Sequence, residues 1–173
     1  IPKLLNGLIG TRFKVINGFQ TSAQGMLAME RGEVEGAGSS WSTLKTSKAD
    51  WIKDKKLTII FQHTPERHRE LPNVPDLVDL ATNDQDRQVL ALYESGAVVG
   101  RSILAPPDVP ATTVKTLRTG FDAMLKAPAL LAEIEHSHAE FDPMSGATLQ
   151  EIVKKTLDVS DAVKARAKIA LAP

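Results

Sequence analysis

The first third of the chain alternates between short β-prone runs and amphipathic helical stretches, and this alternation constrains the fold more than any other feature. Residues 12–16 alternate apolar and polar side chains, and residues 57–61 form a β-branched and aromatic run. Between them, residues 22–31 and 45–56 have helical character, and residues 33–39 fit a further short strand. Strands that alternate with helices pair in parallel in layered proteins. The pattern therefore predicts an α/β fold.

The composition of the sequence suggests a boundary within the chain, and its first ten residues suggest that more sequence precedes them. Residues 62–83 are rich in proline and charge, which predicts an extended connection and a boundary between two parts, 1–62 and 63–173. The chain starts at Ile1 without a methionine, and its apolar residues up to Gly10 have the spacing of a helix that lacks a capping residue. We therefore expect further sequence upstream of Ile1. The alternative interpretation is that processing of the protein leaves Ile1 as the native start of a short N-terminal helix.

The second part of the chain is predicted to contain mainly helices. A capping box formed by Thr82 and Gln85 predicts a helix that ends at Gly96, and residues 98–105 have the composition of a strand. Apolar spacing and proline positions predict the remaining elements, which are helices from Pro110, from Pro128 and from Leu149, the last interrupted near Ser160, and a short strand over 139–142.

Charge and cysteine content exclude several classes of function. The 21 basic and 21 acidic side chains balance, so the chain lacks the positive excess that binding to a phosphate backbone requires, and we expect no nucleic-acid partner. It contains no cysteine, which excludes disulfides and thiolate catalysis. No apolar run reaches the roughly 18 residues of a membrane span.

Catalytic and metal-binding signatures are absent from the sequence. The glycine- and serine-rich run at 36–41 is neither a nucleophile elbow nor a dinucleotide-binding loop. The chain has two pairs of histidines, 63/68 and 136/138, and neither pair has the spacing that places two imidazoles on one helix face. We interpret the carboxylates of 133–142 as a solvent-exposed face. We expect no enzyme activity, no metal and no cofactor. The alternative is an α/β hydrolase or transferase that uses Ser39 or Ser40 as nucleophile and requires a histidine base.

The candidate binding site lies where two predicted strands end. Residues 16–22 lead from a strand directly into a helix, so the free N–H groups of the first helical turn and the hydroxyls of Thr21 and Ser22 create an environment that receives anions. In a parallel sheet the second strand end, with Ser39, Ser40 and Trp41, lies beside the first and adds hydroxyl donors and an aromatic wall. This arrangement predicts a site for a small anion.

Four segments of the chain, taken in their order and spacing, resemble those of a known protein family. These are FKVINGF at 13–19, LAMERGEVEG at 27–36, LPNVP at 71–75 and APPDVPA at 105–111. Together they resemble the substrate-binding receptors of tripartite tricarboxylate transporters, also called Bug-type receptors. The resemblance implies a type II periplasmic-binding-protein-like fold, with two lobes of mixed βαβ sheets, of which this chain is the C-terminal part. Residues 1–62 would belong to the second lobe, and 63–173 to the connection and the return segment to the first.

The resemblance also implies a function and a set of ligand contacts. Such receptors are periplasmic, are exported with a signal peptide, and deliver a carboxylate-bearing ligand to a membrane permease. A family loop that commonly reads Pro-Tyr-Lys-Gly-Ser aligns with residues 18–22, where Gln20 replaces the lysine and Thr21 the glycine. We expect a small organic acid (a di- or tricarboxylate, an amino acid or an aromatic acid). The implied contacts are Gly18, Phe19, Gln20, Thr21, Ser22, Ala23, Ser39, Ser40 and Trp41.

Overall fold

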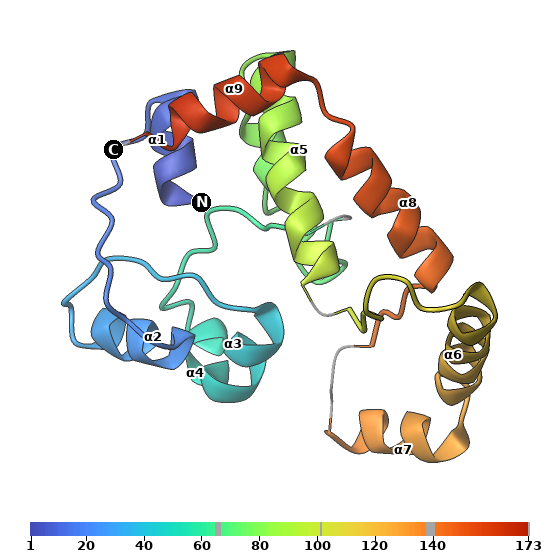
Figure 1. The fold of residues 1–173 in the computed structure, drawn as a ribbon. Helices are drawn as coiled ribbons and strands as arrows, with labels where there is room; N and C mark the ends of the chain where they lie inside the picture. The colour runs from blue at the N-terminus through green and yellow to red at the C-terminus, as the bar shows by residue number, and fades with distance from the viewer. Residues whose placement is uncertain (65–66, 101, 138–140, 173) are drawn as a thin grey trace. The chain divides into compact units, whose positions relative to one another are not determined.

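The computed structural model describes residues 1–64, 67–100, 102–137 and 141–172, and the regular elements of these residues are all helices, joined by irregular segments (Figure 1). The chain divides into two compact units, Ile1–Ile59 and Ile60–Pro173. None of the helices in the described residues is long and apolar enough to cross a bilayer.

The prediction of an α/β fold with mixed βαβ sheets is wrong. Within the described residues, the only β pairing is one isolated parallel bridge between Gln62 and Asp76. The runs 12–16, 33–39 and 57–61 form no strand because no neighbouring segment supplies the ladder of hydrogen bonds that a sheet requires. None of the apolar side chains in these runs is fully buried, and Ile16 and Ile60 are 48% and 57% exposed.

The two strands predicted in the second part of the chain also fail to form. Residues 98–99 complete a helix, and the described residues that follow up to 105 form no strand. Of the strand predicted at 139–142, residues 139–140 lie outside the described residues, and 141–142 form no strand. The type II periplasmic-binding-protein-like architecture, which requires sheets in both lobes, is therefore corrected to a helical one.

The first unit contains four helices with well-defined ends. The helix α1 (Pro2–Ile9) ends at Gly10, whose φ of 72° is left-handed, as the sequence predicts. The helix α2 (Ser22–Glu30) begins after Thr21, whose hydroxyl accepts from the Gln24 N–H, which confirms the helix predicted over 22–31. Two shorter helices follow, α3 (Trp41–Ser47) and α4 (Ala49–Lys53).

The second unit is organised around one long helix. The helix α5 (Asp84–Val99) contacts the 3-10 helix η1 (Leu77–Leu80) and the helices α8 (Gly146–Leu157) and α9 (Asp161–Ala170). The helices α6 (Ala111–Met124) and α7 (Pro128–Ser137) complete the unit. Its buried apolar side chains come from η1, α5 and α9 and are Leu77, Val89, Leu90, Val163, Ala167 and Ala170.

Helix ends in the second unit follow the predicted signals, with shifts of a few residues. The cap of α5 is Asn83, which accepts from the Asp86 N–H, rather than Thr82. The helix continues past Gly96 because a glycine inside a helix costs only about 1 kcal/mol relative to alanine, which does not by itself end it. Pro110 is the residue before α6, Pro128 is the first residue of α7, and Ser160 caps α9 after the predicted interruption.

Gln62 organises the segment that the sequence predicts to be an extended connection. Its backbone N–H donates to the Pro75 carbonyl, and its carbonyl accepts from the Leu77 N–H. Its side-chain amide donates to the carbonyls of Leu71 at 3.1 Å and Val74 at 2.7 Å, and its side-chain oxygen accepts from the His68 N–H at 2.7 Å. The buried side chain thus makes a compact loop out of a proline-rich sequence.

A buried ion pair joins α5 to α9. Arg166 Nε lies 2.7 Å from Asp86 Oδ1, and Arg166 Nη2 lies 3.3 Å from Asp86 Oδ2. The side chain of Asp86 is 2% exposed, and that of Arg166 is 27% exposed. The Arg166 guanidinium therefore lowers the pKa of the Asp86 carboxyl, assisted by a hydrogen bond from the Asn83 amide.

Candidate functional site

The predicted site residues of the first loop surround the start of α2. Gly18 has a φ of 109°, a conformation that favours glycine, and brings the chain into the turn before the helix. The Gln20 N–H donates to Gln24 Oε1 at 2.7 Å, while the Gln24 N–H donates back to Thr21 Oγ1 at 3.3 Å. Phe19 is 41% exposed. The loop is thus held by reciprocal side-chain contacts with the first turn of the helix.

The first turn of α2 leaves two backbone donors free. The N–H groups of Gln24 and Gly25 bond to the hydroxyl and carbonyl of Thr21. The N–H groups of Ser22 and Ala23 come before the first intrahelical bond, and no acceptor for them occurs among the described residues. These two groups stand at the positive end of the helix dipole and can donate to an anion.

The second group of predicted residues lies at the start of α3. Ser40 caps this helix: its hydroxyl oxygen accepts from the Thr43 N–H and lies 2.7 Å from Thr43 Oγ1. Ser39 Oγ is shielded from solvent and has no hydrogen-bond partner among the described residues. The ammonium of Lys45 lies 5.8 Å from the centre of the Trp41 ring. Ser40 is therefore occupied by capping, whereas Ser39 keeps an unused hydroxyl.

A cavity of about 290 Å³ separates α2 from α3. At one end, Glu30 and Lys48 form an ion pair of 2.8 Å that joins the last residue of α2 to the residue after α3. The same ammonium of Lys48 lies 4.6 Å from the Trp51 ring. The wall combines aliphatic side chains with hydroxyls and this ion pair, and is formed by Ala23, Met26, Leu27, Glu30, Thr43, Leu44, Ser47 and Lys48.

The structure brings some of the predicted site residues to this cavity and keeps others apart from it. Ala23 lines it directly, and Ser40 reaches it through its contact with Thr43. Gly18, Phe19 and Gln20 form the loop before α2, outside the lining. The predicted convergence of two strand ends does not occur, because the described residues contain no sheet.

Histidines do not gather into a metal site in the described residues. The first unit contains no histidine in its sequence, so it offers Ser39 and Ser40 no imidazole base of its own. No group of three or more metal-ligating side chains occurs in the described part of the chain. His136 lies in the last turn of α7, near the negative end of the helix dipole, whereas His138 lies outside the described residues.

Comparisons with protein-family models, with curated proteins and with solved structures found no match.

Sequence reasoning missed a carboxyl pair in the second unit. Glu94 on α5 faces Asp76, the buried cap of η1, and its Oε1 is buried without a hydrogen-bond partner among the described residues. Burial, followed by the nearby carboxyl groups of Asp76 and Asp79, raises the pKa of Glu94 to about 8. The spacing of Glu94 from Leu90, four residues along the helix, was the available signal, because it places a carboxyl on the buried face.

We expect the stability of the chain to fall with pH because of Glu94. Between about pH 4.5 and pH 8 the folded chain keeps a proton that the unfolded chain has released, so the free energy of unfolding decreases across this window and levels off above it. Glu94→Gln should remove this decrease and raise the melting temperature near pH 9. Calorimetry at about pH 5 and about pH 9 measures both effects.

The matched control for this prediction is Glu151→Gln on an exposed position of α8, which should leave the pH dependence unchanged. A Glu94→Gln variant with the same pH dependence as the parent would contradict the assigned role of the Glu94 carboxyl.

Proposed function

We propose that the first unit binds a small organic acid, with its carboxylate at the start of α2 and its carbon skeleton in the cavity between α2 and α3. One observation carries this proposal: Ala23, which lines the cavity, has a free backbone N–H, as does Ser22 immediately before it. A carboxylate can accept from both groups, and the aliphatic wall formed with Met26 and Leu44 contacts its apolar atoms.

Neutral donors are sufficient for such a site. Hydrogen bonds to a charged acceptor contribute about 1.5–3 kcal/mol each, so two backbone donors hold a carboxylate without a paired arginine. Lys48, the cationic member of the cavity wall, already pairs with Glu30. Ligand capture without catalysis is the role that Bug-type receptors perform, and the proposal includes their periplasmic location and delivery to a membrane permease, which rest on the motif resemblance.

Replacing Ser22 with proline tests the backbone contact directly. Ser22 is the first residue of α2, where proline fits the helix while removing one N–H donor, and the extended conformation of Thr21 suits a residue before proline. We expect Ser22→Pro to weaken carboxylate binding roughly tenfold, the equivalent of about 1.4 kcal/mol, with the helix retained. Isothermal titration calorimetry against mono-, di- and tricarboxylates measures this.

The matched control is Ser22→Ala, which keeps the N–H group and removes only the hydroxyl. It should bind within about twofold of the parent. If Ser22→Pro and Ser22→Ala bind carboxylates equally well, the α2 amides are not the contact. If the parent chain binds sugars or cations but no carboxylate, the proposed function itself is wrong.

A further inference from the structure

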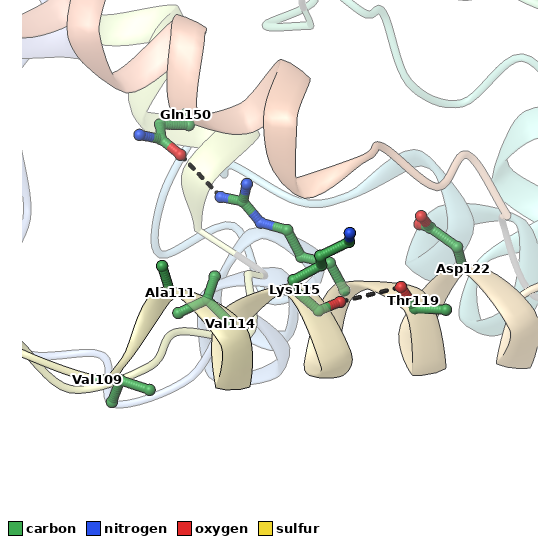
Figure 2. Close-up of a pocket in the computed structure, with 8 residues that line it drawn as sticks. Val109, Ala111, Val114, Lys115, Thr119, Asp122 and Gln150 are labelled. Carbon is green, nitrogen blue, oxygen red and sulfur yellow. Dashed lines mark hydrogen bonds between the residues drawn. The ribbon is translucent and has the colours of Figure 1, made fainter.

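A groove in the second unit has side chains suited to a ligand other than the one in the proposed function. The groove between α6 and α8 has a volume of about 560 Å³ and is lined by the cationic side chains of Lys115 and Arg118. Figure 2 shows Lys115 and Asp122 projecting from the same side of α6, and a dashed line marks the hydrogen bond between Gln150 on α8 and Arg118. Val109, Ala111 and Val114 form its apolar end.

Within the part of the chain that the structure describes, neither cation of this groove has an anionic partner. No carboxylate of the described residues lies within 4.0 Å of Lys115 Nζ or of the Arg118 guanidinium, although Asp122 lines the same groove. The partner of Arg118 is neutral: its Nη2 donates to Gln150 Oε1 at 2.7 Å. Most N–H donors of the guanidinium therefore remain available to a ligand.

Packing against α8 holds Arg118 in place. A Cβ built on Gly146, the first residue of α8, would lie 2.9 Å from Arg118 Nε, so a larger residue there would displace the arginine. The absence of a side chain lets the arginine stem lie against the helix. The Gln150 contact then fixes the end of the guanidinium. A positioned guanidinium loses less rotamer freedom when it binds than a free one.

We propose that this groove binds the phosphate group of a small phosphorylated ligand through Arg118 and Lys115. The planar guanidinium matches two phosphate oxygens at once, and the ammonium of Lys115, three residues earlier on α6, adds a second positive charge on the same helix face. The carboxylate of Asp122, one turn beyond Arg118, repels an anion and confines the phosphate to the Lys115–Arg118 end of the groove.

Titration with inorganic phosphate, followed by NMR through the Arg118 Nε–H signal, tests this site. We expect Arg118→Gln to weaken phosphate binding at least tenfold and Asp122→Asn to tighten it about threefold, because one substitution removes a donor cation and the other a repelling charge. Gln150→Glu should weaken binding about fivefold, since the new carboxylate pairs with Arg118 while keeping it in place. Binding by the parent should also weaken with added salt.

These variants separate a groove site from unspecific anion binding. Retention of full phosphate affinity in both Arg118→Gln and Gln150→Glu would overturn the proposal, as would an unchanged affinity in Asp122→Asn. Acetate is the second probe: binding of acetate as tight as that of phosphate would overturn the assignment to phosphate groups. The site shares no residue with the α2 cavity, so the outcome of this experiment is independent of the carboxylate titrations.

Discussion

Replacing Asp86 with alanine is expected to lower the free energy of unfolding by about 3–5 kcal/mol, as is usual when one partner of a buried ion pair is removed. The substitution leaves the Arg166 guanidinium without its carboxylate between α5 and α9, where it is only 27% exposed. It also removes the acceptor of the Asn83 amide at the start of α5. Urea denaturation followed by circular dichroism measures the loss.

The pH dependence of this effect distinguishes a lost ion pair from a lost packing contact. The pKa of Asp86 is lowered in the folded chain, so its contribution is fully present above the unfolded value of about 3.8 and disappears as the pH falls through the folded value. The difference between the parent and Asp86→Ala should therefore shrink in strong acid. A difference that stays constant down to about pH 2 would contradict the ion-pair explanation.

Lys164→Ala provides the matched control, because Lys164 pairs with the fully exposed Asp161 on the same helix. We expect it to change stability by less than about 1 kcal/mol, as exposed pairs do.

Replacing Gln62 with alanine is expected to lower the free energy of unfolding by about 3 kcal/mol, on the basis of roughly 1 kcal/mol or more for each hydrogen bond lost in a buried setting. Three bonds disappear, to the carbonyls of Leu71 and Val74 and from the His68 N–H, and the groups left behind lie in a loop that closes over them. Denaturation gives the magnitude. Hydrogen exchange at the His68 amide should accelerate in the variant.

Two further variants define what Gln62 does. Gln62→Glu keeps the acceptor for the His68 N–H, but it replaces the amide donor with an oxygen that faces the carbonyl oxygens of Leu71 and Val74. Because acceptors repel one another, this variant should be at least as unstable as Gln62→Ala. Gln85→Ala, which loses one long bond of 3.4 Å from an exposed position, should be nearly neutral. If Gln62→Ala were as mild as Gln85→Ala, the loop would not depend on this side chain.

Residues close together in the sequence predicted the helices. They could not predict whether β-prone segments would pair into a sheet. Thr21 caps the helix predicted after it, Gly10 ends α1, and the interruption predicted near Ser160 is the start of α9, because caps and left-handed backbone depend on residues only a few positions apart. A strand also needs a partner that can be far away in the chain. Residues 57–61 have β-prone composition but meet no neighbouring strand, so the inference from composition to sheet failed.

The residues of the candidate carboxylate site could be predicted from the sequence where they lie at the start of a helix. Thr21 and Ser40 were singled out as hydroxyls at strand ends, and both are caps of helices. The cavity behind them depends on how α2 and α3 pack, and the contact of Arg118 with Gln150 joins residues 32 positions apart, which no local pattern reveals. Asp86 carried a readable signal, because it shares its helix face with the buried Val89 and Leu90.

The ion pair between α5 and α9 also constrains the order in which the second unit assembles. Asp86 and Arg166 are 80 residues apart, and closing a loop of that length costs about 4 kcal/mol of chain entropy before any contact repays it. The three helices inside the loop, α6, α7 and α8, contain no fully buried residue to guide the closure. We therefore expect the part of the core between Val89 and Val163 to close only after α9 has been synthesised, because the partner of Asp86 lies on that helix.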